Sequence, residues 1–151
     1  MRKVDLSQMA CPIARSLDVI GEWWTLVIVR DAMRGATRFE DFRQVGISDN
    51  ILSARLRRLT EEGIFERRAY QEHPERFEYL LTDKGRDLMT VIGAIALWGI
   101  KWTPGPQVNR MVHEECGHGL TLQAYCEDCG RVVTRSEIRV PQMFHPERAA
   151  V

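Results

Sequence analysis

Apolar positions near the start of the chain recur at the spacing of two successive helices. Three of them lie three or four residues apart, namely Ile13, Leu17 and Ile20. Pro12 suits a first helical turn, and Gly21 follows the last apolar position, so we expect a helix between them. The run EWWTLVIVRDAMRG at 22–35 has helical length and ends in an arginine and a glycine. Its β-branched residues also permit a strand, but its length and ending favour a second helix.

The following segments predict a short helix and then a longer one with a charged side. Residues 37–46, TRFEDFRQVG, fit one or two helical turns. Ser48 can cap the next helix, and Asp49 in its first turn is favourable at the positive end of the helix dipole. The buried face of this helix is predicted to carry Leu52, Leu56 and Leu59. The other side carries polar or small residues, namely Asn50, Ser53, Ala54, Arg57, Arg58 and Glu61.

A hairpin and a long helix are predicted next. IFERRAY and RFEYLLT are β-prone runs, and QEHPE between them predicts an irregular loop. Thr82 can cap a helix that ends before the breaker TPGP at 103–106. Its apolar stripe consists of Leu88, Val91, Ile92, Ile95, Trp98, Gly99 and Trp102. The order of elements predicts an α+β winged helix-turn-helix, with a long C-terminal dimerisation helix and a small Cys/His-containing tail.

Length and composition narrow the functional classes. The 151 residues suffice for one domain with an appendage. We expect a DNA-binding and dimerisation domain at 1–103 and a Cys/His tail at 104–151. The longest apolar stretch, VIGAIALWGI, is about half the length that spans a bilayer, and no signal peptide is evident. This predicts a cytoplasmic protein without a membrane partner. Because the formal net charge is zero, binding of nucleic acid would need a local basic patch.

The charged helix has residues suited to the major groove of double-stranded DNA. In a helix-turn-helix, the second helix places its N-terminal residues at base edges while flanking cations hold phosphates. Asparagine pairs with adenine, alanine contacts the thymine methyl group, and arginine binds guanine or phosphate. The predicted DNA-contacting residues are Ser48, Asn50, Ser53, Ala54, Arg57, Arg58, Arg67, Arg68 and Arg76. The alternative is a solvated amphipathic helix, which most exposed mixtures of Arg and Glu form.

Several motifs, in order over roughly residues 10–100, resemble the HxlR-type winged-helix transcriptional regulators. They are the CP pair at 11–12, GEWWTLVIVRDAMRGATRFEDFR, GISDNILSARLRRLTEEGIFERR, PERFEYLLTDKGRDL and the WG pair at 98–99. The resemblance implies a homodimer whose two recognition helices bind a pseudo-palindromic operator, with terminal helices forming much of the dimer interface. One departure is Glu22, where the family usually has lysine, which puts any contact made by that lysine in doubt.

Dimerisation and signalling are expected to involve two places in this domain. Dimer contacts are predicted on the long helix, at Ile95, Trp98, Gly99 and Trp102. Cys11 lies at the cysteine of the family's CP motif, and in some members this thiol resembles a sensor of oxidants, quinones or aldehydes. A thiolate preceding a helix is stabilised by the helix dipole, which raises its reactivity. The alternative is a small packed residue. An effector, either electrophile or small ligand, would act at Cys11 or at the dimer interface.

The tail HEECGHGLTLQAYCEDCGRVV has the ligand spacing of a zinc site. A His-x2-Cys pair and a Cys-x2-Cys pair are separated by nine residues. The candidate ligands of a tetrahedral zinc ion are His113, Cys116, Cys126 and Cys129. His118 competes with His113 as the fourth ligand. The alternatives are a hairpin with unligated cysteines and a redox pair formed by Cys126 and Cys129.

Other classes of function have weaker support in the sequence. No glycine-rich phosphate loop or nucleophile elbow is present, and the tail cysteines lack the βαβ context of a thiol oxidoreductase. We therefore expect a protein that is not an enzyme. A protein-interaction adaptor would use the same long apolar helix, but only a regulator predicts salt-dependent, sequence-selective DNA binding. We expect repression by an operator-bound dimer whose half-sites lie about one helical turn apart.

Overall fold

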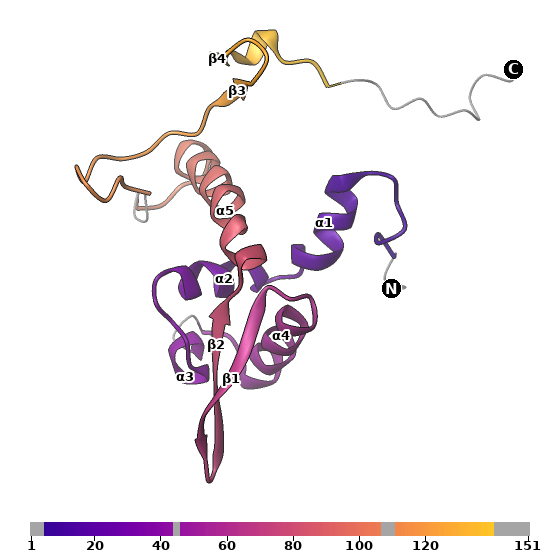
Figure 1. Cartoon of the computed structure of the whole chain (residues 1–151), viewed down its shortest axis with the longest axis vertical. Coiled ribbons are helices and arrows are strands. Elements are labelled where there is room, and N and C mark those ends of the chain that lie inside the picture. The colour runs from indigo at the N-terminus through magenta and orange to yellow at the C-terminus, as the bar shows by residue number, and fades with distance from the viewer. Residues whose placement is uncertain (1–4, 44–45, 107–110, 141–151) are drawn as a thin grey trace, which may run out of the picture. The chain divides into compact units, whose positions relative to one another are not determined.

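The computed structural model describes residues 5–43, 46–106 and 111–140, and its chain divides into two compact units, Met1–Arg110 and Met111–Val151. The first unit mixes helices with a two-stranded sheet (Figure 1). Its elements are α1 (Pro12–Ile20), α2 (Thr25–Met33), α3 (Phe39–Phe42), α4 (Asp49–Glu61), β1 (Phe65–Glu72), β2 (Glu75–Leu81) and α5 (Asp83–Trp102). This is the predicted order. Gln44 and Val45 of the segment predicted as a short helix lie outside the described residues.

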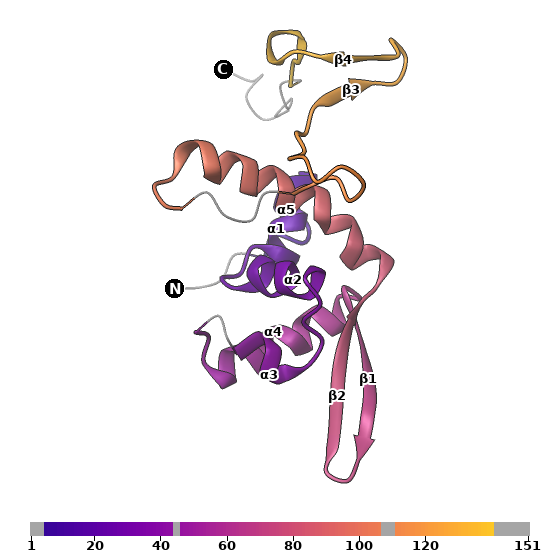
Figure 2. The ribbon, with the colours of Figure 1, turned by 90° about the vertical axis from the view of Figure 1, so that its left-hand side faces the viewer.

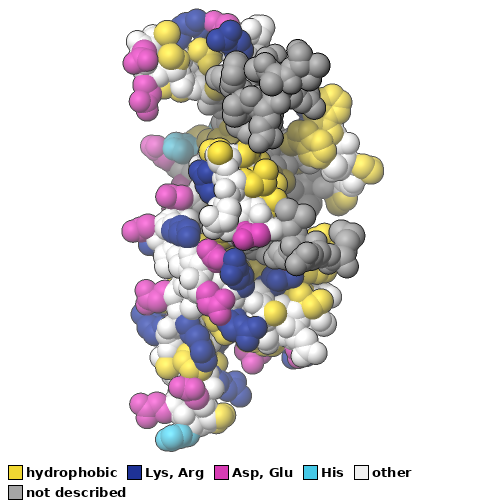
Figure 3. Space-filling model, turned by 90° about the vertical axis from the view of Figure 1, so that its right-hand side faces the viewer, with side chains coloured by type: hydrophobic (Ala, Val, Ile, Leu, Met, Phe, Trp, Pro, Cys, Tyr) yellow, Lys and Arg dark blue, Asp and Glu magenta, His cyan; other side chains and the backbone are white. Residues whose placement is uncertain are grey.

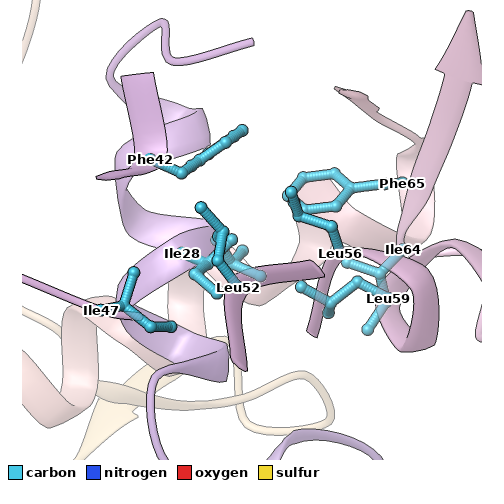
Figure 4. Close-up of a cluster of buried hydrophobic side chains, with 9 residues drawn as sticks. Ile28, Phe42, Ile47, Leu52, Leu56, Leu59, Ile64 and Phe65 are labelled. Carbon is cyan, nitrogen blue, oxygen red and sulfur yellow. The ribbon is translucent and has the colours of Figure 1, made fainter. Parts of the chain in front are cut away.

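A single apolar core holds α2, α3, α4 and the start of β1 together (Figure 4). All nine of its residues are at most 6% exposed: Ile28, Val29, Phe42, Ile47, Leu52, Leu56, Leu59, Ile64 and Phe65. Burying such a side chain stabilises the fold by about 1.5–3 kcal/mol relative to leaving it exposed. The three leucines predicted for the inner face of α4 all belong to this core. The orientation of α4 is therefore fixed by its apolar stripe.

The hairpin β1–β2 projects beyond the helices as a wing (Figure 2). Its antiparallel register runs from Phe65 opposite Leu81 to Glu72 opposite Glu75, with an irregularity between Ala69 and Gln71. The predicted irregular loop QEHPE is wrong in extent, because pairing continues through its outer residues and leaves only two residues at the tip. The irregularity lies instead within β1, where the strand can absorb an unpaired residue as a bulge.

The helix ends follow the sequence signals in most cases. Pro12 begins α1, and Gly35, just past α2, has a φ of +99° that suits glycine. The Thr82 hydroxyl accepts a hydrogen bond from the Gly85 N–H at 3.2 Å, which caps α5 as predicted. Ser48 occupies the N-cap position of α4 without a side-chain capping bond, so that part of the prediction is wrong. No helix in the described ranges has both the length and the hydropathy to cross a bilayer.

The second unit consists of short hairpins without a buried apolar core among its described residues. Strands β3 (Ala124–Cys126) and β4 (Arg131–Val133) pair antiparallel, and the single-turn 3-10 helix η2 (Arg135–Glu137) follows them. A separate bridge joins Val112 to Gly119. Within 111–140 no residue is buried, and only Met111, Cys126 and Val133 are even half-buried.

Candidate nucleic-acid interface

The side of α4 that faces away from the core is exposed to solvent. Because its leucines face inward, the positions at helical spacing on the other side face solvent. Asn50, Ser53 and Arg57 are exposed, and Ala54 between them is half-buried. These residues form a polar stripe along the first three turns of the helix. The stripe has amide, hydroxyl and guanidinium groups, all of which can hydrogen-bond to base edges or phosphates.

An ion pair fixes the first turn of α4 in place of the expected serine cap. Asp49 Oδ1 lies 2.9 Å from Nε of Arg43, the residue that follows α3. Both side chains are more than half exposed, so this pair contributes little to stability. The pair instead connects the residue after α3 to the first residue of α4. Arg43 is a cation beside the polar stripe that the sequence prediction did not include.

The two adjacent arginines of α4 have different surroundings. The side chain of Arg57 is 76% exposed, and its nearest carboxylate oxygen, on Glu61, is 3.9 Å away. Arg58 is 46% exposed and lies 2.7 Å from Glu62 and 3.7 Å from Asp18 of α1. Arg57 therefore projects its charge outward, whereas Arg58 is held by two carboxylates against the first helix.

A second ion pair joins α4 to the segment before α2. Nη2 of Arg55 donates to Glu22 Oε2 at 2.9 Å, and its Nε donates to the backbone carbonyl of Trp23 at 3.3 Å. Arg55 is half-buried on the flank of α4, near the apolar stripe. Glu22, at the position where the HxlR-type proteins usually have lysine, therefore binds α4. A hollow of about 270 Å³ lies beside this pair.

The cations of the wing are held by aromatic and acidic neighbours. The guanidinium carbon of Arg67 lies 3.3 Å from the centroid of the Phe77 ring. Arg68 donates from Nε to Glu78 Oε1 at 2.7 Å, across the strand pair. The carboxylate fixes the direction of the guanidinium and partly cancels the positive charge that would attract a phosphate. Arg76 is exposed near the tip. These three arginines therefore differ in how freely they can bind an anion.

The base of the wing is joined to the segment before α3. The Tyr79 N–H donates to the Thr37 carbonyl at 2.7 Å, and Arg38 forms a β-bridge with Glu78. Arg38 also places its guanidinium carbon 4.3 Å from the centroid of the Tyr70 ring. Its cation, which the sequence prediction missed, therefore lies on the wing although it belongs to the helical part of the chain.

The Asp41 carboxylate orders the start of α3. It accepts hydrogen bonds from the backbone N–H groups of Arg38 at 2.8 Å and Thr37 at 3.0 Å. These two bonds hold the pKa of the Asp41 carboxyl below its usual value, because they stabilise the charged form. The residue therefore anchors the first helix of the helix-turn-helix.

The surface charge over this region is mixed. Figure 3 shows arginine or lysine side chains interspersed with carboxylates over the lower part of the molecule, where the hairpin lies. The whole chain is formally neutral. Attraction to a polyanion must therefore arise from the local arrangement of cations rather than from net charge.

Cys11 lies at the N-cap position of α1 and is half-buried. Its carbonyl oxygen accepts a hydrogen bond from the Arg15 N–H at 3.2 Å, as an N-cap residue does. The other three cysteines are in the tail. The predicted sensing role of Cys11 remains a prediction.

The predicted dimer residues lie on an exposed apolar side of α5. Ile95 is 50% exposed, Trp98 62% and Trp102 64%. A methyl group added at Gly99 would meet only the Thr103 hydroxyl, at 3.8 Å, so the described fold leaves this position open. An apolar groove of about 640 Å³ runs between α1 and α5. It is lined by Ile13, Leu17, Ile20, Leu88, Val91 and Ile95.

The four predicted zinc ligands occur as two local pairs in the tail. Nδ1 of His113 lies 3.2 Å from the Cys116 sulfur. Cys126 and Cys129 form the other pair. Hydrogen bonds from the backbone and side chain of Cys129 lower the pKa of the Cys126 thiol, because they stabilise its thiolate. Within the described ranges, no three His, Cys, Asp or Glu side chains are grouped as a metal site. The structure therefore brings together the members of each pair but not the two pairs.

Comparison with known proteins identifies the family. The HTH-type transcriptional regulator Mb3122 of Mycobacterium bovis is 39% identical over 129 residues, which are 83% of this chain and 82% of that protein. The transcription factor structure PA1607 has a TM-score of 0.77 and 40% identity, over 90% of this chain and 97% of that one. The oxidised redox regulator HypR has a TM-score of 0.57 and 33% identity, over 63% of this chain and all of that one. The HxlR-like helix-turn-helix model matches residues 19–107, so the chain belongs to the HxlR-like helix-turn-helix family.

Proposed function

We propose that this transcriptional regulator acts as a homodimer that binds a pseudo-palindromic operator and represses transcription when that operator overlaps a promoter. The observation that carries the proposal is the exposed polar stripe of α4, held outward by three fully buried leucines. Helices of this kind enter the major groove of DNA. Membership of the HxlR-like family supports the same placement.

The residues of α4 divide into base readers and phosphate contacts. Asn50, Ser53 and Ala54 lie in the first two turns, where side chains reach base edges. Arg57 follows on the same side with an extended, weakly paired guanidinium that suits guanine or phosphate. Arg58 contributes less, because carboxylates from α1 and α4 already engage it.

The wing supplies contacts to the adjoining backbone or minor groove. Arg67 and Arg76 present cations along the hairpin, and the Phe77 ring beneath Arg67 holds its guanidinium in one direction. Arg68 must exchange its bond to Glu78 for a phosphate if it is to bind DNA. We therefore expect the largest loss of affinity in the wing from replacing Arg67 or Arg76.

The homodimer would form through the exposed apolar sides of α1 and α5. Large side chains such as Trp98 and Ile13 are exposed on this side, and contiguous apolar surface of this kind typically marks a protein interface. The open position at Gly99 permits a close approach of a partner helix. In sedimentation at micromolar concentration, we expect a dimer for the native chain and monomer for Trp98→Asp. A native monomer at that concentration would contradict the dimer.

The decisive experiment compares operator affinity with non-specific affinity. Reduced protein is titrated against its own upstream DNA and a scrambled duplex at two salt concentrations, with anisotropy as the readout. We expect a specificity ratio on the order of a thousand, with both affinities falling steeply in salt. Asn50→Ala should reduce this ratio, whereas the control Arg86→Ala on α5 should leave it unchanged. Equal binding to every tested promoter fragment and its scrambled form would favour the adaptor function instead.

The spacing of the two half-sites provides a separate geometric test. Two recognition helices related by a two-fold axis bind the same face of the duplex, with half-site centres about one helical turn apart. Inserting five base pairs between the half-sites would rotate one by about half a turn. Affinity should then fall toward the non-specific value. Unchanged affinity would contradict simultaneous binding by both helices.

A response to oxidants or electrophiles at Cys11 is a second part of the proposal. Its support is the thiol at the N-cap of the nine-residue helix α1, together with the likeness to HypR, a redox regulator. Oxidation or alkylation there would displace the start of α1. Operator binding is measured before and after diamide treatment in the native chain and in Cys11→Ser. Equal responses in both proteins would assign the response elsewhere or exclude it.

A further inference from the structure

The tail contains two turns with the same sequence pattern and the same backbone form. The first is HEECG at 113–117, and the second is CEDCG at 126–130. In each, the glycine N–H donates to the carbonyl oxygen of the first residue, at 2.8 Å in the first turn and 2.9 Å in the second. The φ angles of Gly117 and Gly130 are +69° and +62°, in the left-handed region that favours glycine. The repeat therefore extends from the sequence to the backbone.

Each turn brings a first and a fourth side chain to the same side. His113 Nδ1 and Cys116 Sγ are 3.2 Å apart. Two ligands of one tetrahedral zinc ion lie roughly 3.5 Å apart, given zinc–nitrogen and zinc–sulfur bonds of about 2.0 and 2.3 Å. The second turn holds Cys126 and Cys129 at its first and fourth positions, as the first turn holds His113 and Cys116.

The tail also lacks the apolar burial that would stabilise these turns. No residue in 111–140 is buried, although the segment has two strand pairings and seven large apolar side chains outside the turns. All seven are exposed: Val112, Leu120, Leu122, Tyr125, Val132, Ile138 and Val140. Hairpins with three-residue strands are marginal by themselves, and units of this size usually need a metal ion or disulfides.

We propose that the tail binds one Zn²⁺ through His113, Cys116, Cys126 and Cys129, and that the ion draws the two turns together as a structural site. The three cysteines bind as thiolates, so their protons are released to solvent. In the structure the two pairs belong to separate hairpins. The segment 119–123 between them must therefore bend when the ion binds.

The structure also distinguishes between the two candidate histidines. His113 begins its turn and has a ring nitrogen beside the Cys116 sulfur. His118 lies beyond the glycine, and its backbone carbonyl accepts from the His113 N–H at 2.9 Å, on the returning side of the hairpin. Its position corresponds to Arg131 in the second turn, which follows the glycine in the same way. His113 is therefore the fourth ligand.

The test measures zinc in the full-length protein purified under reducing conditions without chelator. Elemental analysis should give one zinc per chain in the native protein. Cys116→Ser, Cys126→Ser and His113→Ala should each lower the zinc content several-fold, whereas the controls Cys11→Ser and His118→Ala should retain it. Replacing zinc with Co²⁺ should give the visible absorption of a tetrahedral thiolate site, and Cys126→Ser should weaken it.

Other outcomes would overturn the site. Native protein that contains no zinc and gives no cobalt spectrum after reconstitution would exclude it. Zinc retained by the ligand variants would place the ion elsewhere, and zinc lost only in His118→Ala would exclude this ligand set. A Cys126–Cys129 disulfide found by mass spectrometry in protein that cannot take up metal after reduction would establish a redox pair instead. The experiment measures metal content and not DNA binding, so its results are independent of operator binding.

Discussion

Replacing Arg57 or Arg58 with alanine should have different consequences, although the two residues are adjacent in α4. The Arg57 guanidinium points outward and has one carboxylate neighbour, 3.9 Å away. Arg58 lies between Glu62 and Asp18, whose side chains are only 22% and 17% exposed. Arg57→Ala should therefore weaken DNA binding and leave stability almost unchanged. Arg58→Ala should lower stability more and weaken DNA binding less.

The magnitudes follow from exposure and from the contacts that are lost. An exposed pair at helical i,i+4 spacing contributes at most about 0.5 kcal/mol, which limits the effect of Arg57→Ala on folding. A lost guanine contact costs about 1–3 kcal/mol per half-site, or roughly fivefold to 150-fold in affinity, and a homodimer loses two. Removing Arg58 leaves two partly covered carboxylates unpaired, with a cost of roughly 1 kcal/mol after allowance for solvent screening.

Two measurements on each variant separate these effects. Anisotropy titrations at several salt concentrations give affinity and salt dependence, and urea unfolding followed by tryptophan fluorescence gives stability. If Arg57 binds a phosphate, the slope of log affinity against log salt should fall by about 0.9 per contact. Arg86→Ala removes one exposed positive charge from α5 and controls the affinity measurement for the change in net charge. Native-like affinity and salt slope for Arg57→Ala would refute the assignment of the outward face.

Two further predictions concern the scaffold of the interface. Gly85→Ala should destabilise the winged-helix unit by about 1–3 kcal/mol, because the new methyl group would clash with the Ile64 carbonyl oxygen. Urea unfolding should show a lower midpoint for this variant, and an unchanged midpoint would contradict the prediction. Because backbone N–H groups of Arg38 and then Thr37 hold the Asp41 pKa below 3.8, the stability it contributes is present above that pH and is lost as pH falls through the folded-state pKa. At pH 6, Asp41→Asn should therefore unfold at a lower urea midpoint than the native chain. The difference between the two midpoints should shrink in acid.

Elements whose residues repeat at a regular spacing were predictable from sequence. The leucine stripe of α4, the proline that begins α1 and the threonine cap of α5 each depend on neighbours within one or two turns. The wing loop was less predictable because strand pairing depends on backbone hydrogen bonds between partners. Gln71 and Glu72 have side chains typical of a loop, yet both pair across the hairpin. Polar composition alone therefore overestimated the loop.

At the candidate site, the sequence pattern likewise predicted the features set by neighbouring residues but not those set by contacts between distant segments. Helical spacing sufficed to place Arg57 and Arg58 away from the leucines, but it did not distinguish them. The distinction depends on Asp18, which reaches Arg58 only through the packing of α1. Arg38 was missed for a similar reason, since its proximity to Tyr70 joins the start of α3 to the wing. In the tail, the two-residue spacing within His113/Cys116 and Cys126/Cys129 predicted the two pairs. Bringing the pairs together requires the intervening segment to bend.

The contacts of α1 connect Cys11 and the apolar groove with α4, and they limit the effect that a signal acting there would have on operator binding. This helix has Cys11 at its start, Ile13 and Leu17 in the apolar groove, and Asp18 directed to Arg58 of α4. A modified thiol or a changed dimer contact that displaced α1 would therefore alter an ion pair on α4. Such a pair is worth at most about 1 kcal/mol in each chain, or about 2 kcal/mol in a dimer, which is roughly a 30-fold change in operator affinity. A larger response would require the two α4 helices to change their separation, because only that motion removes one half-site from the groove.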